Sequence, residues 1–402
     1  MDAFIVSAAL DTNGQNARYV KAAQKHGKAR AVLQAFAIGS SDPAGVVMRF
    51  QQAAEKGNEL RIRSAHRTPN YLDFPMDLFW DDEHDREIRQ LIMDADVIHL
   101  NNSYRAMRHF HIRRPMLLHH HGSLFRDNAV GMLQLAREHR MVSAVSTVDL
   151  LRKAPEKLHW LPSAYDIDAL QKLRKQHKRP DDGLVRIVHA PTNRDGKHTS
   201  VLLKAVKTLQ AEGLPVDIDL VEGVTNAECL VRKAKGDIVF DQLLYGYGCN
   251  SIEAWGMGIP VISGSDEWTD ARMREMWGDV PYAVASESSL LDVLRQLVKS
   301  KDMRAEYGAK GLAHVRKYHD EKPALATLAE LYALAIRTYE RVRSTVMPST
   351  FKAPSGLKVG VLGQYVEFSK EPLKVEDPDI IERLRYLASR QKRFGIVELL
   401  DG

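Results

Sequence analysis

Short apolar runs alternate with longer helical stretches along most of the chain. In the first half, runs with the character of buried strands fall at 4–9, 31–38, 95–100, 115–119 and 141–146, and residues 16–26 have the pattern of a helix. Each run is short and is bounded by Gly, Pro, Asn or Asp. This alternation is typical of a parallel sheet that is covered by helices on both faces.

The same pattern restarts near residue 184. It predicts strands at 184–189, 216–221, 238–241 and 260–263, and helices at 199–212, 227–233, 252–257 and from 287 to about 343. We therefore expect an α/β protein with two Rossmann-like, doubly wound domains, residues 1–165 and 184–345. A hinge at 166–183, which includes the basic run 172–179, joins them. Ligands of such sheets bind at the carboxyl ends of the strands, so the expected active site faces the cleft between the domains.

The end of the chain has a different pattern. A linker is predicted at 348–354, strands at 357–368 and 394–400, and a helix at 379–389. We expect residues 350–402 to form a small β-rich appendage that serves oligomerisation or docking.

Composition narrows the class of protein. The chain has 402 residues, of which 44% are hydrophobic and 27% charged, as in ordinary globular proteins. No apolar run is long enough to span a bilayer, and the start of the chain lacks the pattern of a secretory signal. With only two cysteines, Cys229 and Cys249, the expected location is the reducing cytoplasm. The net charge of +5 is compatible with a polyanionic partner and does not require one.

The most informative stretch runs from Asp237 to Ser263. A predicted strand leads into a loop with Gly246 and Gly248, and a helix begins near Asn250 and Ser251. Glycines before a helix N-terminus let backbone N–H groups approach an anion, which the helix dipole favours. Glu253, one turn into the helix, is placed to hydrogen-bond vicinal hydroxyls such as those of a ribose. The alternative is a tight turn with an exposed glutamate.

A second candidate site follows the first strand of the second domain. The run from His189 to Ser200 contains Asn193, Arg194 and Lys197 just before a predicted helix. Two cations beside a helix N-terminus suit a diphosphate, because they neutralise the charge that accumulates on a leaving group. The alternative is a solvated basic loop.

The segment Glu253-Ala254-Trp255, followed by Gly258-Ile259-Pro260-Val261, resembles the signature of the family-4-like retaining glycosyltransferases, which have the GT-B fold. The resemblance implies that Glu253 holds the donor ribose. The family has a second glutamate, which contacts the donor sugar, where this chain has Tyr245. We hypothesise that Asp241, at the end of the preceding strand, compensates for it.

The same resemblance extends to the basic loop. It implies that Arg194 and Lys197 bind the donor phosphates and that Glu222 and Gly223, after the next strand, lie near the nucleotide base. His198 stands where the family has glycine.

Three consecutive histidines end a predicted strand of the first domain at His119-His120-His121-Gly122. Successive strand residues point to opposite faces, so these side chains cannot all bind one metal ion, and no metal site is expected. The resemblance implies that His121, with His120 as second choice, faces the donor sugar together with Gly122 and Arg126. A histidine of the core is the alternative. The loop around Gly14 is matched to the glycine-rich loop of the family, or is a plain turn.

We therefore expect a glycosyltransferase, transferring a hexose or pentose from a nucleotide sugar such as a UDP-sugar with retention and without a metal or other cofactor. His121, Arg194 and Lys197 are the expected catalytic residues. The tail is similar to short modules of structural proteins of tailed phages, which implies a phage origin and a virion protein or hydroxymethylated DNA base as acceptor. The alternatives are a lipid-linked or cell-wall glycan as acceptor, a non-catalytic nucleotide-sugar-binding protein, and a sugar-nucleotide epimerase.

Overall fold

The computed structural model describes residues 32–42, 44–69 and 72–346. The described residues up to Glu340 belong to one compact unit, and the second unit, Arg341–Gly402, is described only over its first residues, which end a helix. The predicted elements 4–9 and 16–26, the loop with Gly14 and the appendage at 350–402 lie outside the described residues.

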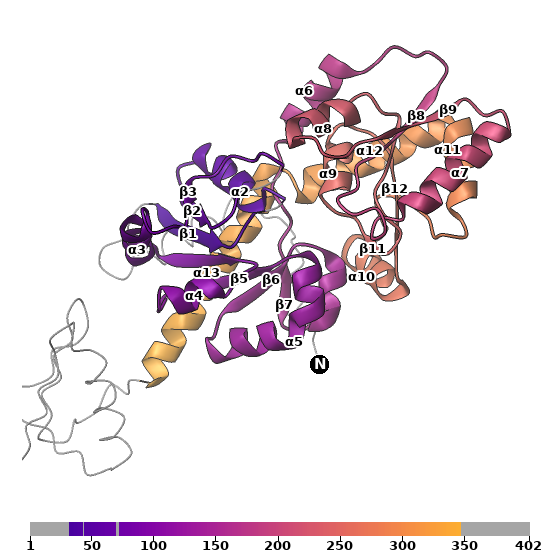
Figure 1. Cartoon of the computed structure of the whole chain (residues 1–402). Helices are drawn as coiled ribbons and strands as arrows, with labels where there is room; N and C mark the ends of the chain where they lie inside the picture. The colour runs from indigo at the N-terminus through magenta and orange to yellow at the C-terminus, as the bar shows by residue number, and fades with distance from the viewer. Residues whose placement is uncertain (1–31, 43, 70–71, 347–402) are drawn as a thin grey trace, which may run out of the picture. The chain divides into compact units, whose positions relative to one another are not determined.

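The first sheet is fully parallel, with the strand order β3-β2-β1-β4-β5-β6-β7 (Figure 1). Its strands are β1 (Leu33–Gly39), β2 (Leu60–His66), β3 (Leu78–Phe79), β4 (Val97–Asn101), β5 (Met116–His120), β6 (Val142–Val145) and β7 (Leu158–Trp160). The connecting helices are α2 (Val46–Glu55), α3 (Asp85–Asp94), α4 (Arg105–His109), α5 (Gly122–Glu138) and the 3₁₀ helix η1 (Val148–Lys153). β1 is an inner strand, third in this order, so the loop after it lies within the carboxyl edge of the sheet.

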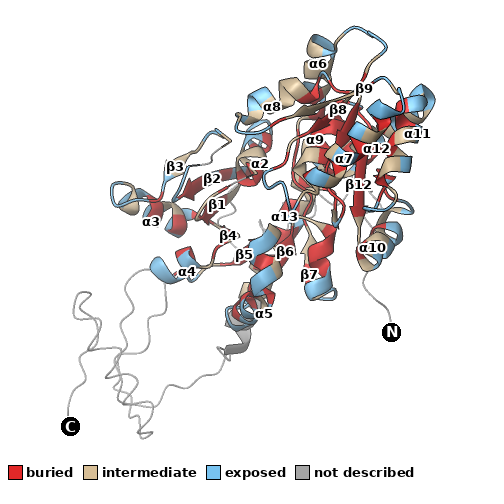
Figure 2. Ribbon diagram, turned by 45° about the vertical axis from the view of Figure 1, so that its right-hand side comes forward, coloured by how far each residue is buried: buried red, intermediate tan, exposed pale blue. Residues whose placement is uncertain are grey.

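The two faces of this sheet are covered by separate hydrophobic clusters. On one face, Phe50 of α2 and Leu328 and Tyr332 of the last helix pack over the strands. On the other face, Ile88 of α3 and Met107 of α4 do so. Figure 2 accordingly shows buried strands beneath helices whose outer sides are exposed. Burial on both faces explains why apolar residues occupy consecutive positions in these strands, such as 97–98 in β4 and 116–118 in β5.

The second sheet has the order β11-β12-β10-β8-β9, and β13 pairs with β12. All pairs are parallel except β11 with β12. Its strands are β8 (Val185–His189), β9 (Val216–Leu220), β10 (Ile238–Phe240), β11 (Tyr245–Gly246), β12 (Val261–Ser265) and β13 (Ala283–Val284). Its helices are α7 (Thr199–Ala211), α8 (Asn226–Lys233), α9 (Cys249–Gly256), α10 (Glu267–Trp277), α11 (Leu290–Lys299) and α12 (Lys301–Tyr318).

Two helices connect the sheets. The expected hinge 166–183 contains α6 (Ile167–His177), whose first turn is capped by Asp166 and whose Leu170 packs closely on Gly256 of α9. The last helix, α13 (Glu321–Val346), follows the helices of the second sheet in sequence but covers the first (Figure 1).

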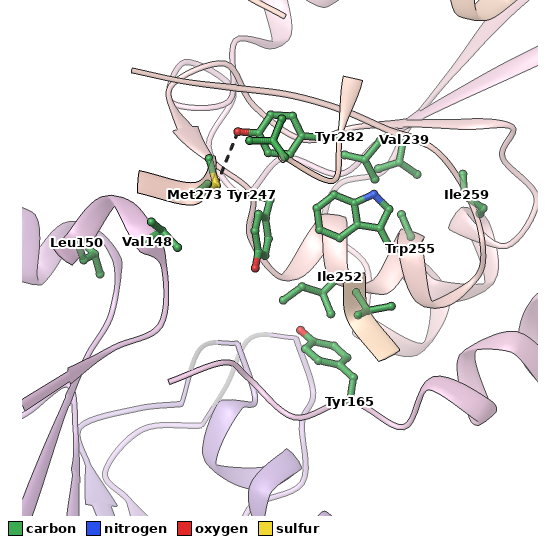
Figure 3. Packing of buried hydrophobic residues seen from close by; sticks show 14 of the residues in the cluster. Val148, Leu150, Tyr165, Val239, Tyr247, Ile252, Trp255, Ile259, Met273 and Tyr282 are labelled. Carbon is green, nitrogen blue, oxygen red and sulfur yellow. Dashed lines mark hydrogen bonds between the residues drawn. The ribbon is translucent and has the colours of Figure 1, made fainter. Parts of the chain in front are cut away.

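One hydrophobic cluster contains residues from both halves of the chain, including Phe125 of α5 and Val148 of η1 from the first and Trp255 of α9 from the second. Figure 3 shows the fully buried Trp255 ring surrounded by Val239, Ile252 and Ile259. The helix α12 approaches this ring so closely that a Cβ atom on Gly311 would lie 1.9 Å from Trp255 Cδ1.

The predicted fold class, with two Rossmann-like sheets in tandem, is confirmed. The apolar runs from 31–38 onward each correspond to a strand of the structure, within one to two residues at most ends. The prediction missed β2, β3 and β7 in the first sheet, β11, β13 and α10 in the second half, and α6 in the expected hinge.

Candidate functional site

The carboxylate of Asp241 is hydrogen-bonded both to the basic loop, which lies in the run from His189 to Ser200, and to the start of α9. Asp241 follows β10 and is fully buried. Its Oδ1 accepts a hydrogen bond from Lys197 Nζ at 2.8 Å, and its Oδ2 accepts from Ser251 Oγ at 2.6 Å and from the Gly248 N–H at 2.9 Å. Burial acts to raise the pKa of Asp241, but the Lys197 ammonium and the two other donors outweigh it, so the pKa is lowered. The structure thus brings together four residues predicted for the donor site.

The basic loop is anchored at both ends. His189, the last residue of β8, is hydrogen-bonded through Nδ1 to the Phe240 carbonyl oxygen and through Nε2 to Thr199 Oγ1 at the start of α7. Burial lowers the pKa of His189 to about 4, so its ring is neutral. His198, which stands where the family has glycine, adopts a left-handed conformation with φ 54°. The turn expected of glycine is therefore kept with a histidine.

Arg194 lies on the exposed side of the same loop. Its guanidinium forms a bidentate ion pair with the carboxylate of Glu222, which follows β9 and directly precedes Gly223 at φ 67°. The pairing raises the pKa of Arg194, and both side chains remain open to solvent, with exposed fractions of 59% and 34%. The predicted phosphate and base residues are thus adjacent, but Arg194 is engaged by an acidic partner. Asn193 stabilises a turn of the same loop, because its Oδ1 accepts a hydrogen bond from the Gly196 N–H at 2.8 Å.

Glu253 lies in a buried ionic cluster. Its carboxylate accepts from Lys233 Nζ, from Arg49 Nη2 at 3.3 Å and from Asn226 Nδ2 at 3.3 Å. The Lys233 and Glu253 side chains are only 3% and 5% exposed. Burial acts to lower the pKa of Lys233, but the Glu253 charge outweighs it and the pKa is raised. The predicted ribose ligand therefore already has three hydrogen-bond donors from the protein.

Arg49 connects the first half of the protein with this ionic cluster. It projects from α2, and its guanidinium stacks on Tyr165, 4.2 Å from the ring centroid, and on Phe74 at 4.8 Å. Sequence reasoning missed Arg49, because nothing near it in the sequence indicates a partner 204 residues away.

Tyr245 contacts α5, a helix that packs on the first sheet. The Arg126 guanidinium lies over its ring, 3.9 Å from the centroid. Arg126 belongs to α5 and is held by Asp149, whose Oδ2 accepts from Arg126 Nε at 2.8 Å. Gly246 beside it has φ 74°, a left-handed conformation that favours glycine. Two residues that were predicted for opposite sides of the site are thus in direct contact, whereas Asn250 has no partner for its buried amide among the described residues.

The three consecutive histidines divide between the two faces of β5, as strand geometry predicts. The rings of His119 and His121 lie on one side with centroids 4.1 Å apart, whereas His120 stacks on Phe125 at 4.0 Å on the other side. Burial lowers the pKa of His120 to about 3 and that of His121 to about 4, so both are neutral. His120 is therefore packed under α5 and does not join His121. Gly122, with φ 51°, begins α5 directly after His121.

Further polar residues at this edge were missed. Asn101 and Asn102 at the end of β4 bind His121: its Nε2 lies 2.8 Å from Asn101 Oδ1, and its backbone N–H donates to Asn102 Oδ1 at 3.0 Å. Asp42, in the loop after β1, accepts from the N–H groups of Val46 and Val47. The missed signal was the run 31–38, since the loop after a central strand is the expected ligand loop of such a sheet.

No group of three or more His, Cys, Asp or Glu residues within 32–346, apart from the undescribed positions 43, 70 and 71, is arranged to hold a metal ion. Cys229 and Cys249 are free thiols. None of the helices in the described part of the chain has the length and apolar character needed to cross a membrane.

Two Rossmann-like α/β sheets in tandem, with a last helix that returns to the first sheet, define the GT-B fold. Among solved structures the chain is similar to Anabaena HepE, crystallised with UDP and glucose, at 15% identity and a TM-score of 0.53 over 75% of this chain and 99% of that one. The HepE complex with UDP gives 14% identity and a TM-score of 0.54 over 75% and 100%. Its complex with UDP-glucose gives 13% and 0.53 over 75% and 99%. No known protein-family profile matches the sequence, and comparison with curated protein sequences found no relative.

Proposed function

We propose that this protein is a glycosyltransferase that moves a sugar from a nucleotide diphosphate to an acceptor hydroxyl. The observation that carries the proposal is the arrangement around Asp241, which holds Lys197 beside the N-terminus of α9 at the carboxyl end of the second sheet. A cation and a helix N-terminus in one place are suited to a diphosphate. The fold that carries them is shared with HepE, which binds UDP and UDP-glucose.

In the proposed reaction, the bond between the anomeric carbon of the sugar and the diphosphate oxygen breaks, and a bond from the same carbon to the acceptor oxygen forms. The acceptor proton passes to the departing diphosphate. Charge on the leaving oxygens is neutralised by Lys197 and by the start of α9, and Arg194 contributes when it leaves Glu222. The transition state has oxocarbenium character, as in other glycosyl chemistry. We propose that the anomeric configuration is retained and that no metal takes part.

Glu253 is the proposed ribose ligand, and its surroundings set a condition on binding. A carboxylate offers about four acceptor positions, and Lys233, Arg49 and Asn226 occupy three of them. A ribose that donates two hydroxyl hydrogen bonds must therefore displace one of these donors. Arg49 and Asn226, both at 3.3 Å, are the weaker partners.

The proposed acceptor is a virion protein or a hydroxymethylated DNA base, and residues 350–402 are the proposed docking or oligomerisation segment. Transfer to a DNA acceptor falls steeply as the salt concentration rises, because DNA contacts release counterions. Transfer that is insensitive to salt indicates a protein, or a lipid-linked or cell-wall glycan.

The test is a thermal-shift panel of UDP- and GDP-sugars and their diphosphates, followed by measurement of donor hydrolysis. We expect stabilisation by one nucleotide and slow hydrolysis of its sugar. The substitution Lys197→Ala should reduce the rate by about 100-fold, the scale of losing one electrostatic stabiliser. Lys207→Ala, which removes an exposed lysine of α7, is the matched control. No stabilisation of the folded protein by any nucleotide would refute the proposal.

A second candidate is a non-catalytic nucleotide-sugar-binding protein. It is favoured by Tyr245, which replaces a sugar-binding glutamate and lies against Arg126. A thermal shift with neither hydrolysis nor transfer for any donor selects this function over the enzyme.

A further inference from the structure

The orientation of the Asn101 amide follows from its partners. Its Nδ2 lies 3.2 Å from the carbonyl oxygen of Ser41 and 3.4 Å from Asp42 Oδ1. Both oxygens can only accept, so the atom that faces them must be the amide nitrogen. The amide oxygen is then the atom that lies 2.8 Å from His121 Nε2.

This orientation determines the tautomer of His121. An amide oxygen cannot donate, so Nε2 must carry the proton and donate it to Asn101 Oδ1. A neutral imidazole has one proton, which leaves Nδ1 as a lone-pair acceptor. The ring is neutral near pH 7, because burial lowers the pKa of His121 to about 4. Nδ1 has no hydrogen-bond partner among the described residues, and His121 keeps partial contact with solvent.

His121 lies beside the proposed site. The backbone N–H of His121 donates to Asn102 Oδ1, so both the ring and the main chain are held by the end of β4. His121 directly precedes α5, and Arg126 in the second turn of that helix contacts Tyr245 of the second sheet. The first turns of α5 are therefore where the first sheet meets the residues proposed to surround the donor.

We propose that Asn101 is a positioning residue that keeps His121 in the Nε2–H tautomer, so that Nδ1 accepts a hydrogen bond from a hydroxyl group of the donor sugar. The inference rests on the proposed function for the identity of the ligand, whereas the tautomer itself is a property of the free protein. The unprotonated Nδ1 restricts which donor sugars fit the site, because a sugar without a hydroxyl group at the facing position leaves Nδ1 without a hydrogen-bond donor.

The first experiment reads the tautomer directly, in the full chain without ligand. Two-bond ¹H–¹⁵N correlation spectra distinguish protonated from unprotonated imidazole nitrogens, and the His121→Gln variant identifies the signals of His121 among the 16 histidines. At pH 7 we expect protonated Nε2 and unprotonated Nδ1. The variant Asn101→Leu, which removes the acceptor, should give a mixture of tautomers. A wild-type protein with Nδ1 protonated overturns the proposal, whether or not the variants fold.

The second experiment compares ligands with and without the sugar by titration calorimetry. UDP-glucose, UDP-N-acetylglucosamine and GDP-mannose are each paired with UDP or GDP. Loss of one hydrogen bond should weaken the bound nucleotide sugar about 3- to 10-fold in Asn101→Leu and change the diphosphate affinity less than about 2-fold. Asn128→Leu, an exposed asparagine of α5, is the control.

Equal weakening of diphosphate and nucleotide sugar in Asn101→Leu would make the role of Asn101 merely structural and overturn the proposal. If the folded wild type binds neither ligand of any pair, the proposed function fails, and the sugar-directed role of His121 fails with it. A wrong tautomer with intact sugar binding refutes only the role given to Asn101.

Discussion

The buried pair of Lys233 and Glu253 makes the second sheet sensitive to a single neutral substitution. In Lys233→Met the aliphatic part of the side chain is kept and the ammonium is lost. The Glu253 carboxylate, whose side chain is 5% exposed, then keeps only Arg49 and Asn226, both at 3.3 Å. We expect a lower free energy of unfolding, because a buried charge without its closest partner retains most of its desolvation penalty.

Breaking a buried ion pair by removing one partner costs about 3–5 kcal/mol. The remaining contact with Arg49 places the expected loss for Lys233→Met near the lower end, at about 3 kcal/mol. Glu253→Gln, which leaves the lysine buried and unpaired, should cost a similar amount. The double variant should lose less than the sum of the two single losses by about 2 kcal/mol, since it leaves neither charge alone.

The assay is urea unfolding followed by tryptophan fluorescence. Trp160, Trp255, Trp268 and Trp277 belong to or pack against the cluster that contains α9, so the signal reports on this part of the protein. The control is Lys301→Met, which removes the lysine of a pair with Asp181 at 3.3 Å whose side chains are 81% and 76% exposed. An exposed pair contributes about 0–1 kcal/mol.

The reasoning is refuted if Lys233→Met and Lys301→Met change the free energy of unfolding equally. Strict additivity of Lys233→Met and Glu253→Gln would also refute it, because two residues in direct contact that share a buried ionic bond must be coupled.

Three further predictions concern other sites. Asp241→Asn should lower the free energy of unfolding by about 1–3 kcal/mol, because Lys197 loses its charged partner, and urea unfolding measures it; an unchanged value contradicts the arrangement. Gly311→Ala should lower the free energy of unfolding by about 1–3 kcal/mol, because the added Cβ clashes with Trp255. Gly131→Ala, in α5 with open space around it, should leave the free energy of unfolding unchanged or raise it by up to about 1 kcal/mol. The thermal unfolding midpoints of the two variants should therefore differ. Burial lowers the pKa to about 4 in the half-buried His121 and in the fully buried His189. These neutral histidines stabilise the fold fully above their unfolded pKa of about 6.5, and this stability is lost as the pH falls from there to about 4. The free energy of unfolding should therefore be lower at pH 5 than at pH 7 by about 2 kcal/mol per such histidine, and equal values would show that these rings are not desolvated.

Much of the architecture could be predicted from the chain because most of its strands are buried on both faces. Runs such as 116–118 and 238–240 are continuously apolar for that reason, and they lie in β5 and β10. The strand β2 was missed because Arg61 and Arg63 interrupt its apolar pattern, and both arginines are exposed in the structure. The helix α6 was read as part of a hinge, since only Ile167 and Leu170 are buried and the rest of its surface is polar.

Part of the candidate site could likewise be predicted from the sequence, and part could not. Gly248, Ser251, Lys197 and Asp241 are close in two short segments, and each follows or precedes a recognisable strand or helix, so their common location follows from the chain order of a parallel sheet. Their mutual hydrogen bonds, with Asp241 at the centre, depend on side-chain directions that the sequence does not specify.

What the sequence by itself determined about this protein is its local periodicity: two sets of buried strands with helices between them, and polar loops at the strand ends. Only the tertiary structure decided that α13 covers the first sheet, that Arg49 reaches Glu253 and that Arg126 lies over Tyr245. The physical reason is that strand and helix patterns arise from neighbours a few residues apart, whereas these contacts join residues more than a hundred positions apart whose approach is decided by how the two sheets pack.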